Sequence, residues 1–122
     1  MKRRALLSLL FLGVAACAAG NQASNSSSAA ALEAYPPEGQ FLEVSGHRVH
    51  YVEKGNGPPL VLIHGASGNL RDWTYRAVDQ LSRRYRVIAF DRPGMGYTPR
   101  IDSDGASIQQ QAALLSAASR QL

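Results

Sequence analysis

Two glycine-rich loops carry the residues best suited to chemistry: residues 64–69 (HGASGN) and residues 91–97 (DRPGMGY). Each loop follows a short apolar run typical of a buried strand, and ligands of open α/β sheets bind at the carboxyl ends of strands. Glycines allow sharp turns whose backbone N–H groups face outward, next to the positive end of a following helix. We therefore expect the first loop to stabilise a negatively charged oxygen.

Other chemistries have weaker support. Ser67 lies in a Gly-Ala-Ser-Gly run, but Asn69 stands where a nucleophile motif needs its second glycine, so we do not expect Ser67 to be catalytic. His47 and His50 are three apart in a predicted strand, so they should point to opposite faces and cannot jointly hold a metal. Neither histidine has an evident acidic partner. No dinucleotide fingerprint, Walker loop or Cys/His cluster is present, and we expect no cofactor and no metal.

The strand pattern predicts an α/β fold. Residues 41–45 and 47–53 alternate in polarity on either side of Gly46, which indicates an antiparallel hairpin. The runs at 60–63 (LVLI) and 86–90 (RVIAF) are continuous and apolar, as expected of strands buried on both faces. Because helical segments follow both runs, the sheet should contain parallel strands joined by right-handed crossovers.

Two helices should complete these units. The first is predicted to begin at Asn69, and one of its faces carries Trp73, Ala77, Val78 and Leu81. The second should begin with a capping box formed by Ser107 and Gln110. Its apolar side is predicted to carry Ile108, Ala112, Leu115 and Leu122.

The two loops in this order resemble those of the α/β-hydrolase family. The resemblance rests on a strand ending in His-Gly (LVLIHG), on Trp73 in the next helix, and on a following strand that leads into FDRPGMGYT. It covers residues 40–122. It implies the N-terminal portion of an α/β-hydrolase sheet, an antiparallel hairpin followed by two βα units, with the rest of the domain missing.

The resemblance also implies roles for particular residues. The backbone N–H of Ala66 would supply one donor of an oxyanion hole, and the residue after the nucleophile would supply the second. His64 and Asp91 would brace their loops and would not be the base and acid of a triad. The same two loops would be shaped by four glycines: Gly65, Gly68, Gly94 and Gly96. The family's G-x-S-x-G-type elbow does not occur in this chain, so the nucleophile, acid and base are expected to be absent from it.

The N-terminus predicts a bacterial secretion signal. Cationic residues 2–4 precede an apolar run at 5–16, which is shorter than the roughly 20 residues of a membrane span. Val14-Ala15-Ala16-Cys17 resembles a lipobox, whose cysteine receives lipid, and Cys17 is the only cysteine. Ala18 after it favours anchoring at the outer membrane, facing the periplasm. Cleavage after Ala16 or Ala19 by the ordinary signal peptidase is the alternative.

These patterns divide the chain into three parts. Residues 1–16 are the predicted signal peptide, and 17–39 a lipidated N-terminus with a flexible linker. The linker is small and polar at 18–31, and such a stretch buries too little apolar surface to offset its ordering entropy. Residues 40–122 are the partial α/β-hydrolase domain.

The charge balance argues against a nucleic-acid partner. The chain has 13 Lys+Arg and 9 Asp+Glu, and three of the cations lie in the first four residues, which leaves 10 against 9 elsewhere. A nucleic-acid binder would need a basic face on the folded domain, and this balance predicts none. The expected partners are a lipid membrane, through acylated Cys17, and a small-molecule substrate in the full-length parent.

Two functions are compatible with the sequence. The chain is predicted to be the N-terminal fragment of an exported hydrolase that cleaves an ester or related bond, and the fragment itself should be inactive. The alternative is a noncatalytic, membrane-anchored lipoprotein that binds a small ligand at the loop after residue 63. In the family's strand order, the strand at 60–63 lies inside the sheet and pairs with the first strand that would follow residue 122, so the fragment would expose an apolar edge. A partner chain that completes the sheet is a third possibility.

Overall fold

A computed structural model of the chain describes residues 29–122, so the predicted signal peptide and Cys17 lie outside the described residues. The chain divides into two units, residues 1–36 and 37–122. In the first unit, residues 29–34 are helical, within the stretch predicted to be a flexible linker. The Tyr35 N–H donates to the Ala31 carbonyl over 2.9 Å. Among the described residues, no helix has the length and apolar character needed to cross a membrane.

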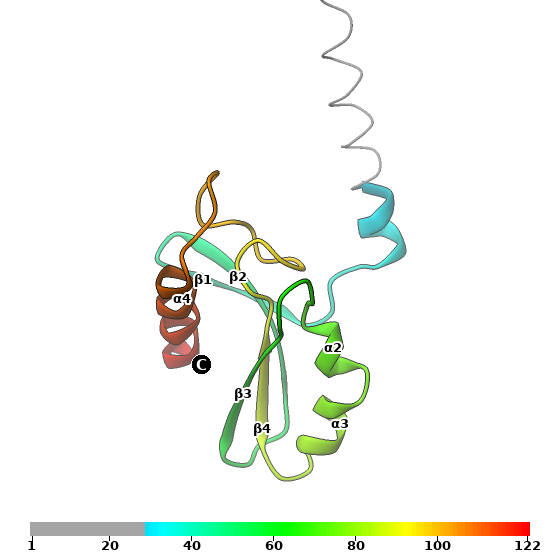
Figure 1. The fold of residues 1–122 in the computed structure, drawn as a ribbon. Helices are drawn as coiled ribbons and strands as arrows, with labels where there is room; N and C mark the ends of the chain where they lie inside the picture. The colour runs from blue at the N-terminus through cyan, green and yellow to red at the C-terminus, as the bar shows by residue number, and fades with distance from the viewer. Residues whose placement is uncertain (1–28) are drawn as a thin grey trace, which may run out of the picture. The chain divides into compact units, whose positions relative to one another are not determined.

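The second unit is built on a four-stranded mixed sheet with the strand order β1-β2-β4-β3 (Figure 1). Its strands are β1 (Gln40–Val44), β2 (His47–Lys54), β3 (Pro59–Ile63) and β4 (Arg86–Phe90). β2 pairs antiparallel with β1 and β4, whereas β3 and β4 are parallel. The predicted α/β class, the hairpin and the parallel pair are therefore confirmed.

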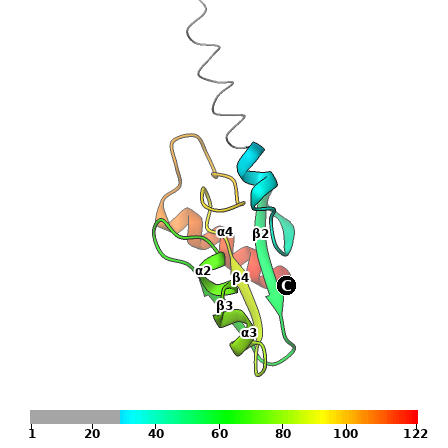
Figure 2. The same ribbon diagram turned by 90° about the vertical axis from the view of Figure 1, so that its right-hand side faces the viewer.

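Helices cover both faces of this sheet. α2 (Arg71–Thr74) and α3 (Ala77–Leu81) lie on one face, and α4 (Ile108–Gln121) lies on the other (Figures 1 and 2). Successive side chains of a strand point to opposite faces, so β4 contributes to two cores. Val87 and Ala89 pack with Leu70 and Val78 beneath α2 and α3. The other core, beneath α4, contains eight buried residues: Val44, Val49, Tyr51, Ile88, Phe90, Leu114, Leu115 and Ala118.

The prediction of one continuous helix after Asn69 is wrong. The segment forms two short helices because the backbone of Arg76, with φ of −153°, leaves the helical region between them. Asn69 does cap the chain locally, since its Oδ1 accepts a hydrogen bond from the Arg71 N–H over 2.9 Å. Trp73 packs against the core beneath these helices, and its buried Nε1 has no hydrogen-bond partner among the described residues.

The last helix is confirmed, but its buried side differs from the prediction. Ser107 and Gln110 form the expected capping box, with hydrogen bonds of 2.8 and 3.2 Å. Leu114, Leu115 and Ala118 are buried, whereas Ile108 is 76% exposed. The prediction for Ile108 is wrong because residues 108–110, the first turn of α4, are exposed, and the helix packs on the sheet only further along.

The prediction that residues 60–63 form a strand buried on both faces is also wrong for the described chain. β3 is the edge of the sheet, with β4 on one side and no strand from residues 29–122 on the other. Val61 is 39% exposed and Ile63 is 47% exposed. β4, by contrast, is buried from Val87 to Phe90 as predicted. The apolar side chains of β3 thus lie at an edge of the sheet that the described residues leave uncovered.

Candidate functional site

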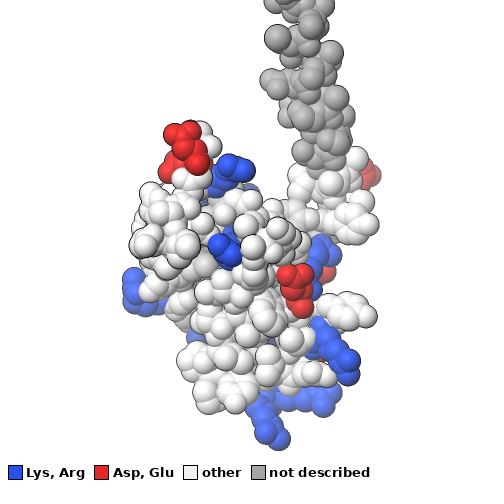
Figure 3. Space-filling view, viewed as in Figure 1, with Lys and Arg blue, Asp and Glu red and all other residues white. Residues whose placement is uncertain are grey.

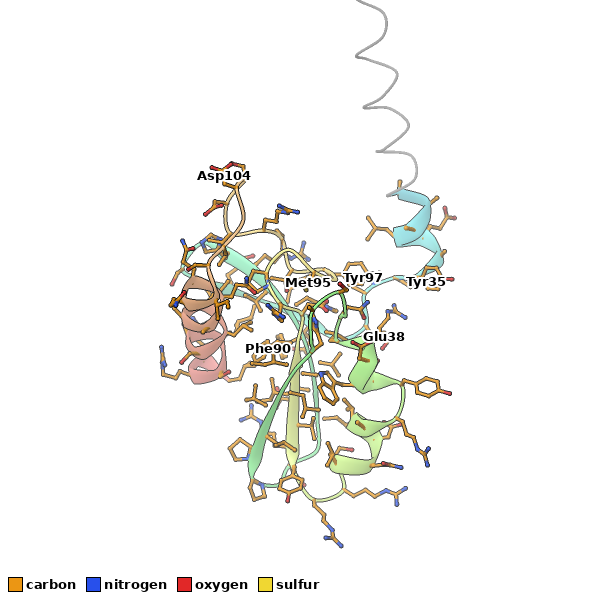
Figure 4. All side chains as sticks on the ribbon, in the orientation of Figure 1. Tyr35, Glu38, Phe90, Met95, Tyr97 and Asp104 are labelled. Carbon is orange, nitrogen blue, oxygen red and sulfur yellow. The ribbon has the colours of Figure 1, made fainter. Side chains whose placement is uncertain are left out.

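The parallel pairing of β3 and β4 brings the two predicted loops together. Ile63 and Phe90 are partners in the register, so both loops leave the sheet at the same end. Figure 4 shows Met95 and Tyr97 of the second loop beyond Phe90, next to the loop that leads from β3 to α2. The predicted site residues of both loops, which are far apart in sequence, therefore form one cluster.

Asp91 is the centre of this cluster. Its side chain is 1% exposed and accepts three hydrogen bonds. The Leu70 N–H donates to Oδ1 over 2.8 Å, and the Tyr97 N–H donates to Oδ2 over 2.9 Å. The third donor is Nδ1 of His50, 2.7 Å from Oδ2. One carboxylate thus fixes the start of α2, the turn after β4 and strand β2.

Two opposing effects act on the pKa of Asp91. Burial is the largest and raises the pKa, because it disfavours the charged form. The hydrogen bonds from His50, Tyr97 and Leu70, together with the charge interaction with His50, outweigh burial and hold the pKa below its usual value. Asp91 therefore stays ionised and is not a proton donor near neutral pH.

His64 joins the two loops directly. Its ring is buried, and Nε2 accepts a hydrogen bond from the Arg92 N–H over 3.0 Å. Nδ1 lies 2.9 Å from the Gly65 carbonyl, which can only accept, so Nδ1 carries the proton and the ring is neutral. Because both ring nitrogens are engaged, His64 has no free nitrogen to act as a general base. This arrangement fits the bracing role expected for it.

The expectation that His50 has no acidic partner is wrong. Nδ1 of His50 contacts Asp91, and Nε2 contacts the backbone carbonyl of Glu38. Both partners are hydrogen-bond acceptors, so the buried ring is engaged at both nitrogens. Sequence reasoning missed the contact because β2 and β4 were not expected to be neighbours. His47, at the start of β2, takes no part in the cluster.

Glycines are required at some of the predicted positions. Gly94 and Gly96 have φ of +80° and +53°, a backbone region that favours glycine. A Cβ on Gly96 would also collide with the carboxylate of Asp91, and a Cβ on Gly68 would collide with that of Asp72. The space around Gly65 would admit a side chain, so packing does not explain a glycine there.

The loop between His64 and Leu70 is exposed at its centre. Ala66 and Ser67 are exposed, and no hydrogen bond engages the Ala66 N–H among residues 29–122. The loop is shaped by a Gly68 N–H to Gly65 carbonyl hydrogen bond of 3.4 Å and by a φ of +62° at Ser67. A positive φ at a non-glycine residue is strained, and such strain clusters at functional sites. His50 and His64, the two buried histidines, are not available as a base for Ser67, since both nitrogens of each ring are engaged.

A shallow groove of about 170 Å³ lies beside this loop, between the end of β3 and α4. It is lined by Ile63, Arg92, Ile108, Gln111, Ala112 and Leu115. Arg92 is held at the groove by Gln111, whose Oε1 accepts from Nη2 over 3.0 Å. Within residues 29–122, no three His, Cys, Asp or Glu side chains are grouped so that they could hold a metal ion.

Comparison with known proteins places these features in a family context. A family model described as the alpha/beta hydrolase fold matches residues 58–120. The chain is 41% identical over 64 residues to (E)-2-((N-methylformamido)methylene)succinate hydrolase of Acinetobacter baylyi, a match that covers 52% of this chain and 24% of the relative. It is 33% identical over 84 residues to haloalkane dehalogenase 2 of Mycobacterium tuberculosis, which covers 66% of this chain and 28% of that protein.

The structural comparison agrees with the sequence matches. The crystal structure of the Cif epoxide hydrolase from Acinetobacter nosocomialis superposes with a TM-score of 0.65 and 29% identity, covering 86% of this chain and 34% of that chain. The chain therefore spans about a quarter to a third of the length of these similar proteins.

Proposed function

Because the alpha/beta hydrolase model matches residues 58–120, this chain belongs to the α/β-hydrolase fold family, and we propose that it is the N-terminal part of an exported hydrolase. The whole enzyme would cleave an ester or a related bond through an activated nucleophile. The similar proteins support hydrolysis as the general reaction, since their names include a succinate hydrolase, a dehalogenase and an epoxide hydrolase.

The observation that carries this proposal is the free N–H of Ala66 at the carboxyl end of β3. A backbone donor that is unpaired and held in a fixed loop can stabilise a developing oxyanion with little reorganisation during the reaction. His64 holds the base of the loop through Arg92, and Asp91 holds its far end through Leu70. The role of this part of the fold would thus be to present one oxyanion donor on a rigid support.

Two features support the packing of further elements of the whole enzyme against this part. Within the described part of the chain, the outer edge of β3 is unpaired and carries exposed Val61 and Ile63, and strand edges of this kind favour pairing. Trp73 keeps a buried Nε1 with no acceptor among the described residues, although buried donors are almost always paired. The nucleophile elbow would follow the strand that pairs with β3, and the chain described here would be inactive by itself.

Export is the second part of the proposal. Residues 1–16 would be removed as a signal peptide, and Cys17 would carry the lipid that anchors the protein, most simply at the outer membrane facing the periplasm. Mass spectrometry of the mature protein from a bacterial host tests this. An acylated N-terminal peptide beginning at Cys17 is expected, and an unmodified N-terminus after Ala16 or Ala19 would contradict lipidation.

Removal of the Ala66 N–H tests the catalytic part of the proposal. In the whole enzyme, Ala66→Pro should lower kcat by roughly 10²- to 10³-fold with little change in KM, as for other oxyanion donors. Ala66→Ser keeps the N–H and is the matched control. Replacement of the amide by an ester at residue 66 removes the same donor without a proline ring. If the ester variant keeps full kcat, Ala66 is not an oxyanion donor.

The isolated chain provides an independent test. It should not hydrolyse a simple aryl ester above the uncatalysed rate, because it lacks the nucleophile, acid and base. Turnover by the chain that disappears in Ser67→Ala would contradict both the fragment proposal and the role assigned to this loop.

A further inference from the structure

Exposed cations flank the short helix α3 at both of its ends. Arg76 lies in the break between α2 and α3, and Arg83 and Arg84 lie in the turn that leads from α3 into β4; all three side chains are exposed. Figure 3 shows Lys and Arg side chains along the lower right of the molecule, over α3 and this turn. The balance of charges over the whole chain does not reveal this local cluster.

The cluster keeps a net positive charge because two neighbouring acidic residues, Asp79 and Glu53, are already paired, which leaves Asp72 of α2 as the nearby exposed carboxylate. Lys54 contacts Asp79 over 2.7 Å, and Arg86 contacts Glu53 over 2.5 Å. Arg76, Arg83 and Arg84 have no carboxylate within ion-pair distance in the described part of the chain. Three positive charges are therefore available to an external anion.

Two tyrosines accompany these cations. Tyr75, next to Arg76, is 91% exposed, and Tyr85, next to Arg84, is 38% exposed. A tyrosine ring is apolar at its body and polar at its tip, which suits the boundary between lipid and water, where tyrosines are enriched. Arginines at the same surface match the geometry of phosphate groups.

We propose that Tyr75, Arg76, Arg83 and Arg84 form a docking surface for an anionic lipid membrane. A tight nucleic-acid complex typically neutralises six to ten phosphates, and three cations do not suffice. Weak attraction to an anionic surface needs only a few cations, each of which contributes about a fivefold gain in binding. Stable attachment generally combines such a basic surface with a lipid chain, so this surface would act together with an acylated Cys17.

Docking here would leave the candidate site accessible from water. Arg83 and Arg84 precede β4, whereas residues 64–69 and 91–97 follow the carboxyl ends of β3 and β4, so these two arginines lie at the end of the sheet opposite the candidate site. Tyr75 and Arg76 lie between the two ends, after α2. The surface is separate from the proposed hydrolase chemistry and can be tested without it.

The test uses the full chain with Cys17→Ser, which prevents acylation and removes the native thiol. An environment-sensitive fluorophore is attached through Gln80→Cys, on exposed α3, or through Asp104→Cys, in the exposed loop before α4. Vesicles of phosphatidylcholine with phosphatidylglycerol should increase the emission at position 80 and not at 104. Vesicles of phosphatidylcholine alone should leave both unchanged.

Two triple variants locate the effect. Arg76→Gln/Arg83→Gln/Arg84→Gln should lower the vesicle-binding constant, measured with the fluorophore at position 80, roughly hundredfold. Each lost cation accounts for about a fivefold decrease, and the three decreases multiply. Arg48→Gln/Arg100→Gln/Arg120→Gln removes the same charge from exposed residues elsewhere and should change it by less than about threefold. Circular dichroism should show the same fold in both.

Three results would overturn the proposal. Equal losses in the two triple variants would mean that net charge alone drives binding. Equal emission changes at positions 80 and 104 would mean that no particular face docks. Tighter binding of the same labelled chain to a single-stranded oligonucleotide than to anionic vesicles would identify a nucleic acid as the partner.

Discussion

The ring of His50 lies 2.7 Å from the carboxylate of Asp91, and both side chains are only 1% exposed. The pair joins β2 to the loop after β4, at positions 41 residues apart in the sequence. Because Asp91 also accepts from Leu70 and Tyr97, His50 helps to set the position of both loops of the candidate site. The N-terminal hairpin is thereby connected to the proposed oxyanion loop.

Removal of His50 should destabilise the domain strongly. His50→Ala leaves a buried carboxylate with one donor fewer and frees the Glu38 carbonyl, so the free energy of unfolding should fall by about 3 kcal/mol or more. His47→Ala, in the same strand and outside the cluster, should cost less than about 1 kcal/mol. Urea unfolding measures both. Equal losses would show that the His50–Asp91 contact adds nothing beyond ordinary side-chain packing.

The lowered pKa of Asp91 predicts the direction of the pH dependence of stability. Burial raises this pKa, and the hydrogen bonds from His50, Tyr97 and Leu70 outweigh burial. The folded state therefore binds the proton less tightly than the unfolded state, whose carboxyl has a pKa near 3.8. The stabilisation is fully present above that value and is lost as the pH falls below it through the lower folded-state pKa.

Unfolding measured across this acid range checks the prediction. Asp91→Asn should be less stable than the parent near neutral pH and should lose part of the parent's acid dependence. If the variant keeps the whole acid dependence, other carboxyl groups are responsible for it.

Gly96 should tolerate no side chain. A Cβ there would meet the carboxylate of Asp91, and the φ of +53° adds backbone strain, so Gly96→Ala should cost about 3 kcal/mol or more. Gly46→Ala meets no atom within 4 Å but keeps a φ of +80°, and should cost about 1–2 kcal/mol. Gly65→Ala has neither problem and should stay within about 0.5 kcal/mol. Thermal unfolding of the three variants separates the cost of the Cβ collision from that of backbone strain. Similar losses of stability for Gly96→Ala and Gly46→Ala would contradict the predicted collision with Asp91.

The open edge of β3 should make the isolated chain self-associate. Val61 and Ile63 are exposed on a strand whose outer edge has no partner in the described sheet. Val61→Lys adds a charge at this edge and should reduce light scattering at equal protein concentration by severalfold. Leu32→Lys, at a helical residue that is 50% exposed, is the control and should have a smaller effect. A monomeric parent chain with a cooperative melt would contradict this prediction and favour a noncatalytic lipoprotein.

The sequence predicted the order of the elements better than their environment. Alternation and Gly46 were sufficient to locate the hairpin, and Ser107 with Gln110 located the start of α4, because these signals are local. Burial depends on which elements are neighbours. The apolar run of β3 looked fully buried, and Ile108 looked like a core residue, but both lie where the described chain provides no cover.

The sequence predicted the two loops of the candidate site, because each loop follows a strand. It did not predict contacts that depend on the order of the strands in the sheet. The loops containing Ala66 and Asp91 could be located because each follows an apolar run. The contact of His50 with Asp91 required knowledge that β2 pairs with β4, which no local pattern contains. The position of His50 in the middle of β2 could have suggested that it has a buried partner, but not which residue that partner is.

The most direct test of the proposed function is the coding sequence beyond codon 122, read in all three frames. We expect a short apolar strand followed by a nucleophile elbow of the G-x-S-x-G type, in frame or after a shift, with an acid and a histidine further along. Such a sequence would identify residues 40–122 as the part of a hydrolase that supplies its first oxyanion donor. A confirmed stop codon with no elbow in any frame after it would contradict the hydrolase proposal for this gene.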